Sequence, residues 1–381
     1  MIDTLFKAYE EDDHLRNVIL PLTLGVKRIV FFSRKPYEEK SYAPAKALYD
    51  KYLQTEIRFV VLNEKNERQQ VCEIFQEYPD AAVDMSGSRY ILLLLFAEAV
   101  HHKLPVFYFD AEEDIVKEYH REDYSPMKPF RLSIEEIISL SGGRIIQHIH
   151  SEPDPKERSV NNLILKTVES CYKDYDQFIS SVTTIDRLYQ NSRHTSATCQ
   201  LNEEDLQKLK KVPLYKKFLE LGLFRLKGNT LTFRSSRIRS LFDVTGSWLE
   251  AYLFIKLQRS GLFDDVKMSV VIDFSDSEKS KYPVTCEIDL LAAKDNHLIF
   301  LSCKSNKVDN VALNEIALHR HTFGNELSVA AVATAVDLPS RSPAIAAKAS
   351  ELGVLILDRE TLEKGWDKEL ERLLKEEFAA L

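Results

Sequence analysis

Apolar and polar positions along the first 110 residues follow two alternating periods. Short apolar runs, such as Arg28–Phe32 (RIVFF), Ile57–Leu62 (IRFVVL) and Val106–Asp110 (VFYFD), predict buried strands. Apolar residues recur every three or four positions over His14–Leu24, which predicts a helix, and Gly87–His101 is predicted to be a long apolar helix. Further strands are expected at 5–9 and 82–85, and further helices at 43–53 and 68–77. Strands that alternate with helices imply a parallel sheet covered on both faces.

The pattern changes in the middle of the chain. Residues 151–159 (SEPDPKERS) are polar and contain two prolines, which predicts a linker. A helical pattern over 160–189, two short helices within 202–221 and a hairpin around Gly228-Asn229 together predict a small winged-helix-like module. A DNA-binding interpretation would use five lysines, whereas a structural connector would leave them in solvent, and we favour the connector. These residues are Lys208, Lys210, Lys211, Lys216 and Lys217.

The last third of the chain contains a pattern with chemical content, Cys286–Lys304 (CEIDLLAAKDNHLIFLSCK). Two apolar strands flank a turn at Lys294–His297, and residues two apart on a strand share a face. Glu287 and Asp289 therefore project together, as do Ser302 and Lys304. If the strands pair as a hairpin, carboxylates and an ammonium group meet over one small patch. An ordinary surface hairpin with solvated charges is the alternative.

Two predicted helices add acids to this patch. Gly246–Phe254 (GSWLEAYLF) carries Glu250 among apolar residues, and Asn314–His321 (NEIALHRH) carries Glu315. Further strands are expected at 266–274, 327–335 and 353–357, with helices at 342–352 and from 360 to the end. This order predicts a mixed sheet flanked by helices.

These residues suit phosphodiester hydrolysis. Carboxylate oxygens are the ligands that Mg²⁺ and Mn²⁺ prefer. A bound cation would lower the pKa of a water and offset charge in the transition state. Asp289 would hold the metal, and Lys304 would orient or deprotonate the attacking water.

Composition limits the partners of the chain. The formal net charge of −8 disfavours coating of nucleic acid by bulk charge, so a nucleic-acid substrate would be met by local basic patches and metal. The charged content of 29% and hydrophobic content of 44% are typical of globular proteins. No apolar run is long enough for a transmembrane helix, and no secretory signal is recognised. The five cysteines include no CxxC pair, so we expect reduced thiols, a cytoplasmic location and no membrane partner.

The stretch DMSGSRY predicts a phosphate-binding site in the first domain. Ser86, Gly87, Ser88 and Arg89 lie between a strand and a helix N-terminus, where free backbone N–H groups and the helix dipole favour anions. The alternative is an ordinary helix cap followed by a solvated arginine. Residues after the first two strands, Glu10–Asp12 and Ser33–Lys35, should lie at the same edge of the sheet. No GxGxxG is present, which disfavours a dinucleotide.

The order of acids and lysine in the last third resembles the PD-(D/E)XK nuclease core. That pattern places an acid two residues before the lysine, and here the position is occupied by Ser302. The resemblance implies that the acid is supplied by Glu315 on the following helix. It also implies catalytic roles for Glu250, Asp289, Ser302, Lys304 and Glu315, with Glu250, Asp289 and Glu315 as the metal ligands.

The ordered set AVDMSGSRYILLLLFAEA, GSWLEAYLF, EIDLLAA and LSCKS resembles the CARF-domain nucleases of type III CRISPR systems along nearly the whole chain. The resemblance implies a homodimer whose nuclease domains are activated by a cyclic oligoadenylate, usually cyclic tetra-adenylate. It implies a Mg²⁺ or Mn²⁺ cofactor and a DNA or RNA substrate. The residues implied to line the ligand site are Asp12, Ser33, Arg34, Ser86, Gly87, Ser88 and Arg89.

The predicted architecture is therefore α/β in three parts. Residues 1–150 form a Rossmann-like CARF domain, 151–243 a winged-helix-like linker, and 244–381 a PD-(D/E)XK domain with a mixed sheet and flanking helices. Two other functions stay open: a ligand-binding regulator with a degenerate nuclease core, marked by Ser302, and a nucleotide-sensing winged-helix transcription factor.

Overall fold

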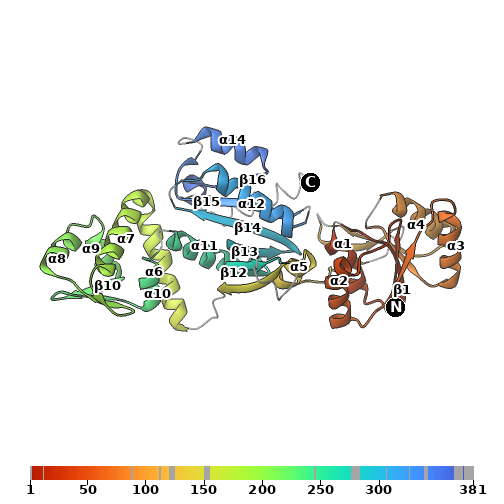
Figure 1. Cartoon of the computed structure of the whole chain (residues 1–381), viewed down its shortest axis with the longest axis horizontal. Coiled ribbons are helices and arrows are strands. Elements are labelled where there is room, and N and C mark those ends of the chain that lie inside the picture. Colours follow the sequence, from red (N-terminus) through yellow and green to blue (C-terminus); the bar gives the residue numbers. More distant parts are fainter. Residues whose placement is uncertain are drawn as a thin grey trace. The chain divides into compact units, whose positions relative to one another are not determined.

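The computed structural model describes most of the chain and divides it into two compact units (Figure 1). The described residues are 2–11, 13–86, 89–110, 113–119, 125–149, 155–243, 246–275, 284–305, 307–325, 327–338, 342–363 and 372. The first unit comprises Met1–Arg144, Phe274–Tyr282 and Phe323–Glu326. The second comprises Ile145–Asp273, Pro283–Thr322 and Leu327–Leu381.

A six-stranded sheet forms the centre of the first unit. Its order is β3-β2-β1-β4-β5-β6, with every described pairing parallel except β5–β6. The strands are β1 (Thr4–Ala8), β2 (Arg28–Ser33), β3 (Glu56–Val61), β4 (Ala82–Asp84), β5 (Val106–Asp110) and β6 (Ile115–Glu118). The helices are α1 (His14–Leu24), α2 (Glu39–Tyr52), α3 (Glu67–Glu77), α4 (Arg89–His102) and α5 (Ile134–Leu140). The predicted parallel sheet is confirmed.

Aromatic and branched residues hold the helices to this sheet. Phe6 and Phe32 lie on one face, where the ring of Phe6 stacks on Phe75 of α3 at 4.4 Å between centroids. Phe31 lies on the opposite face and stacks on Phe59 at 5.1 Å. Successive residues of β2 therefore pack on opposite faces of the sheet, as expected for a strand buried on both sides.

The second unit begins with a mixed sheet whose order is β16-β15-β14-β13-β12-β7. Its strands are β7 (Arg144–Ile149), β12 (Asp265–Asp273), β13 (Thr285–Lys294), β14 (His297–Lys304), β15 (Val329–Thr334) and β16 (Val354–Leu357). The flanking helices are α11 (Ser247–Ser260), α12 (Asn310–Phe323), α14 (Pro343–Glu351) and α15 (Arg359–Glu363). The strands β12, β13 and β14 pair antiparallel, while β14, β15 and β16 pair parallel.

A helical module with a small sheet lies between β7 and α11 in the sequence. Its helices are α6 (Pro155–Cys171), the 3₁₀ turn η1 (Tyr172–Asp174), α7 (Tyr175–Gln190), α8 (Glu203–Lys210), α9 (Tyr215–Leu221) and α10 (Ser236–Ser240). Its strands are β8 (Arg193–His194), β9 (Thr198–Gln200), β10 (Phe224–Lys227) and β11 (Thr230–Phe233), in the order β10-β11-β9-β8. One hydrophobic cluster runs from this module through Trp248 of α11 to the mixed sheet.

Two sequence predictions need correction here. The expected linker 151–159 is shorter than predicted, because α6 already begins at Pro155. Proline is tolerated at the first helical position, where its missing N–H would have no helical partner. The helical pattern over 160–189 is interrupted by η1, so it forms two helices. The final helix is described only as α15, and its predicted continuation lies outside the described residues apart from Arg372.

All five cysteines are free thiols. Among the described helices, none combines the length and apolar character needed to cross a membrane.

Candidate nuclease and ligand-binding sites

The predicted hairpin is formed by β13 and β14. Its two-residue turn, Asp295-Asn296, has φ angles of 53° and 64°. Positive φ at both central residues is typical of a type I′ turn, whose twist matches that of paired strands. Leu290 lies opposite Leu301 in the ladder, so the next residues, Asp289 and Ser302, lie beside each other.

Asp289 is fixed by the strand opposite it. Its Oδ2 atom accepts hydrogen bonds from the Cys303 backbone N–H at 2.6 Å and from the Ser302 hydroxyl at 3.1 Å. The Lys304 ammonium lies 3.9 Å from the same oxygen. Two hydrogen bonds and a nearby ammonium charge orient the carboxylate through Oδ2, and they leave Oδ1 available for another partner.

The helices α11 and α12 bring further groups to this hairpin. Glu315 and His319 lie one turn apart on α12, on one helix face. A cavity of about 190 Å³ opens between α12 and the hairpin. Its lining residues are Glu287, Ile288, Asp289, Ser302, Lys304, Ala312, Glu315, Ile316 and His319. The structure thus brings together four of the five predicted catalytic residues at one cavity.

The fifth residue, Glu250, acts on the same group of charges from α11. Burial, followed by the negative charges of Asp289 and Glu287, raises the pKa of Glu250 to about 7, and the Lys304 charge opposes this shift. Gly246 permits the approach of this carboxylate, because a Cβ at that position would lie 2.9 Å from Glu250 Oε1.

These residues fit a hard divalent cation. The charges of Asp289 and Glu287 on β13 add to the effect of burial on the Glu250 pKa, and a cation among these carboxylates would offset their repulsion. His319 is buried, its pKa is lowered by burial, and its Nδ1 has no hydrogen-bond partner among the described residues. A polar ligand in the cavity would give this nitrogen a hydrogen-bond partner.

Cys303 lies between two cavity residues but faces the hydrophobic core. It is 5% exposed, and burial raises the pKa of its thiol well above the usual value. Strand alternation explains this placement, since Ser302 and Lys304 take the other face.

A second candidate site lies where β1 and β4 pair in the first unit. The chain leaves β1 toward β2 on one side and returns to β4 on the other, and ligands of open α/β sheets bind at such a switch point. Lys7 of β1 forms a fully buried ion pair with Asp84 of β4 at 2.6 Å. Asp84 Oδ1 accepts hydrogen bonds from the Ser86 backbone N–H at 2.7 Å and from its hydroxyl at 2.5 Å.

This ion pair holds the start of the SGSR turn in place. Lys7 also donates to the Ser86 carbonyl at 3.3 Å. The sequence analysis missed Lys7 because β1 resembles an ordinary apolar strand. The available signal was a lysine within a short run, TLFKA, that is otherwise free of charged residues.

The predicted residues after β2 are engaged within the first unit. The Ser33 hydroxyl donates to the Lys35 carbonyl and accepts from the Lys35 N–H. The Arg34 guanidinium binds Glu67 through two hydrogen bonds, of 2.7 and 3.1 Å, and lies 3.7 Å from the Tyr90 ring centroid. Asp12, Gly87, Ser88 and the side chain of Arg89 lie outside the described residues.

Comparison with known families gives a match in the last third of the chain. Residues 237–370 match the sequence model of a family described as "Card1-like, endonuclease domain". We call this stretch the Card1-like domain, for its similarity to that family. All five predicted catalytic residues fall within the matched range, and so does the cavity between α12 and the hairpin. The sequence matches no protein of curated function.

Two solved structures share the fold of nearly the whole chain. The protein VC1899 from Vibrio cholerae aligns with a TM-score of 0.74 at 15% identity, covering 98% of each chain. Can2 from Sulfobacillus thermosulfidooxidans, solved in complex with cyclic tetra-adenylate, aligns with a TM-score of 0.68 at 17% identity. That alignment covers 96% of this chain and 98% of Can2. With the Card1-like domain, this fold confirms the predicted resemblance to CRISPR-associated CARF nucleases.

Proposed function

We propose that this protein is a metal-dependent endonuclease that a cyclic oligoadenylate, most simply cyclic tetra-adenylate, activates in type III CRISPR antiviral defence. The observation that carries the proposal is the cavity of the Card1-like domain, where Asp289, Glu315 and Lys304 converge. We assign ligand sensing to residues 1–150, a connecting role to 151–243 and catalysis to 244–381. Five free thiols favour a cytoplasmic location.

Asp289, Glu250 and Glu315 are the residues that would hold Mg²⁺ or Mn²⁺. When bound, the cation supplies positive charge that makes a water more acidic and stabilises the charge on the phosphoryl oxygens. The Cys303 N–H and the Ser302 hydroxyl keep Asp289 in one orientation. Held in this way, the carboxylate loses little freedom when it binds.

In this proposal Lys304 orients or deprotonates the attacking water. Its ammonium lies at the edge of the cavity, 3.9 Å from Asp289 Oδ2, where it can orient the attacking water. An ammonium in this place would also offset negative charge that develops on the phosphate in the transition state.

Ser302 supports an active core over a degenerate one. It stands where the family pattern has an acid, but its hydroxyl binds Asp289 and so orients that residue. Glu315 lines the same cavity from α12 and supplies the carboxylate that Ser302 lacks. The number of acids around the cavity is thus preserved, which a decayed site would have no reason to maintain.

The switch point of the first unit is the proposed ligand site. The buried Lys7–Asp84 pair holds Ser86, which leads in the sequence to the other proposed ligand residues Gly87, Ser88 and Arg89. The start of α4 then directs its backbone N–H groups toward a ligand phosphate. The fold shared with Can2, solved with cyclic tetra-adenylate, supports this choice of ligand. Asp12, Ser33 and Arg34 are proposed to complete the site from the neighbouring strands.

A homodimer would place two such sites around one ring. The exposed face of α4 carries an apolar stripe, with Tyr90, Leu93 and Val100 exposed by 52%, 67% and 55%. Residues three and seven apart lie on one side of a helix. An exposed apolar stripe on a helix that is hydrophobic all round suits a two-fold interface.

Changing Leu93 to Glu should convert this dimer to a monomer. Burying a carboxylate from each protomer in the interface should raise the dimer dissociation constant by at least about 100-fold. Size-exclusion chromatography with light scattering measures the change. Val311→Glu, at a 71% exposed residue of α12, is the matched control and should leave the mass unchanged. Equal masses for the wild type and Leu93→Glu would remove the α4 interface from the proposal.

The proposed function is tested by cleavage of supercoiled plasmid, single-stranded DNA and single-stranded RNA. Each substrate is offered with Mg²⁺ or Mn²⁺, with and without cyclic tetra-adenylate, and with linear tetra-adenylate as the matched control ligand. Cleavage that needs both the metal and the cyclic ligand is expected, and the substrate that is cut identifies the specificity. Binding of the ligand without any cleavage would favour the degenerate regulator. Failure to bind would contradict ligand sensing.

A further inference from the structure

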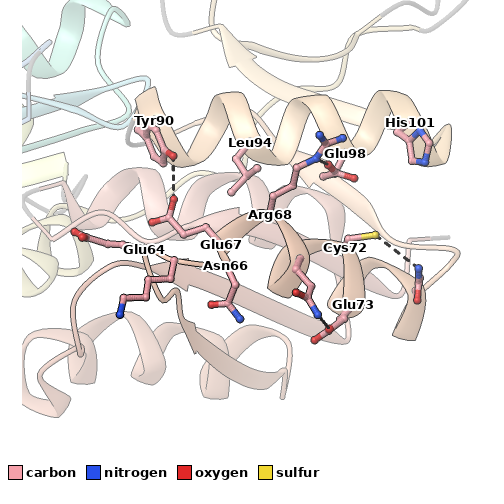
Figure 2. A pocket seen from close by; sticks show the side chains of 13 residues that line it. Glu64, Asn66, Glu67, Arg68, Cys72, Glu73, Tyr90, Leu94, Glu98 and His101 are labelled. Atoms are coloured by element: carbon pink, nitrogen blue, oxygen red, sulfur yellow. Dashed lines mark hydrogen bonds and ion pairs between the residues drawn. The ribbon is translucent and has the colours of Figure 1, made fainter.

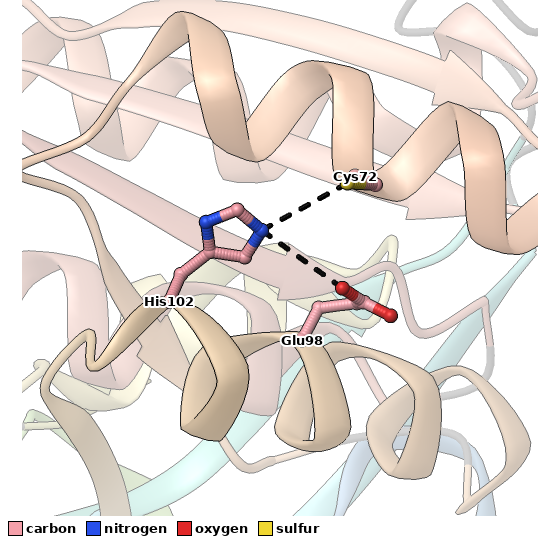
Figure 3. A group of neighbouring side chains, drawn as sticks. All are labelled: Cys72, Glu98 and His102. Atoms are coloured by element: carbon pink, nitrogen blue, oxygen red, sulfur yellow. Dashed lines mark hydrogen bonds and ion pairs between the residues drawn. The ribbon is translucent and has the colours of Figure 1, made fainter.

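Three side chains with metal-ligand chemistry meet between α3 and α4 of the first unit, apart from both sites described above. Cys72 comes from α3, and Glu98 and His102 come from one face of α4 (Figure 3). His102 Nε2 lies 3.8 Å from Cys72 Sγ and 3.9 Å from Glu98 Oε2. The potential ligand atoms all lie within 4.8 Å of one another.

These separations are close to those of a tetrahedral zinc site. Zinc binds sulfur at about 2.3 Å and nitrogen or oxygen at about 2.0–2.2 Å. In a tetrahedron, bonds of that length place neighbouring ligand atoms about 3.5 Å apart. The two distances from His102 exceed this value by a few tenths of an ångström, and the third separation, between Cys72 and Glu98, is at most 4.8 Å. Side-chain shifts that draw the thiol and the carboxylate together would complete the geometry.

The surrounding residues support the ligands. Glu98 is 2% exposed, and its Oε1 atom accepts a hydrogen bond from Arg68 Nε at 2.7 Å, while Oε2 faces His102. Gln76 Nε2 donates to Cys72 Sγ at 3.6 Å and so helps to orient the sulfur. Outer contacts of this kind are what fix ligand orientation in protein metal sites.

A metal ion could reach this point from solvent. A cavity of about 870 Å³ runs along α3 and α4, and Cys72 and Glu98 lie in its wall (Figure 2). Cys72 and His102 are both partly exposed, so water can fill a fourth coordination position.

We propose that Cys72, Glu98 and His102 form a zinc site that ties α3 to α4. Binding would deprotonate the Cys72 thiol and release that proton to solvent as the zinc–sulfur bond forms. Of the two helices so joined, α3 carries Glu67, which binds Arg34. The other, α4, begins at the end of the SGSR stretch. The zinc would therefore restrain the elements next to the proposed ligand site.

Cobalt and zinc titrations of the metal-stripped full-length protein test the proposal. Co²⁺ should give a near-ultraviolet sulfur-to-cobalt charge-transfer band, which requires a thiolate ligand, and one Zn²⁺ per chain should abolish it. Cys72→Ser should remove the band. His102→Gln should weaken binding by more than the roughly 10–100-fold expected for loss of an outer contact.

Two matched variants serve as controls. His101→Gln changes the neighbouring histidine, and Cys286→Ser changes a thiol of the second unit, so both should keep the band. Zinc should raise the melting temperature of His101→Gln by about 5 °C and leave His102→Gln unchanged. Circular dichroism of each variant without metal confirms that it is folded. Absence of the band from the wild type, or its persistence in Cys72→Ser, would overturn the zinc site.

Discussion

Replacing Asp289 with Asn should lower the rate of activated cleavage by at least about a thousandfold. The loss combines a missing metal ligand with weaker charge stabilisation in the transition state. Asn keeps the shape of the side chain, and its amide oxygen can still accept from the Cys303 N–H, so the hairpin should fold normally. Replacing Lys304 with Ala should cost about 10²–10⁴-fold, the range typical of a group that acts on the attacking water.

Single-turnover cleavage at saturating activator measures both effects. Lys294→Ala is the matched control for Lys304→Ala, because Lys294 lies on the same strand pair beside the Asp295-Asn296 turn, at the opposite end of the ladder. It should leave the rate within about twofold. Activator binding should be unchanged in all three variants. Cleavage at the wild-type rate with Asp289 and Lys304 both replaced would show that the cavity is not the active site.

Replacing Glu250 with Gln should stabilise the metal-free protein while removing its activity. The folded-state pKa of about 7 lies above the ordinary value of 4.5. Between these values the folded chain holds a proton that the unfolded chain releases, so the free energy of unfolding falls as the pH rises from about 4.5 to about 7. At 1.36 kcal/mol per unit, the difference amounts to roughly 3 kcal/mol at pH 8. Because Gln cannot ionise, the free energy of unfolding of the variant should not fall over this pH range.

Urea unfolding in EDTA at pH 5 and pH 8 measures the effect. Both tryptophans, Trp248 and Trp366, lie within the Card1-like domain, so their fluorescence reports its unfolding. Glu351→Gln, at an exposed residue of α14, should follow the wild type at both pH values. The wild type should fall below Glu250→Gln only at pH 8. If the free energies of unfolding of the wild type and Glu250→Gln changed equally between pH 5 and pH 8, Glu250 would not be the group whose ionisation destabilises the fold.

The hairpin and its helices were predictable because their signals are local. Alternation along Cys286–Lys304 set which residues share a face, and a Lys-Asp-Asn-His turn between two apolar runs predicted the reversal. The single carboxylate of α11 was equally visible, since apolar residues surround Glu250 in the sequence. Whether these acids bind metal remains a prediction that the experiments above decide.

Other features depend on contacts between distant segments and left no local pattern. Lys7 and Asp84 are separated by 77 positions, and only strand order makes them partners. The Cys72–His102 contact likewise joins two helices. The strand β7 was missed because its burial is low along most of its length, so it lacks the apolar alternation of a core strand.

The position of β7 bears on how the protein can be dissected. This strand precedes the helical module in sequence, yet it forms the edge of the nuclease sheet beside β12. The module of α6–α10 is therefore an insertion within the sheet's own connectivity. A fragment that starts at the polar segment after β7 would leave the backbone groups of β12 unpaired, and exposed strand edges of this kind promote aggregation. The smallest fragment that keeps this mixed sheet complete must begin at or before Arg144.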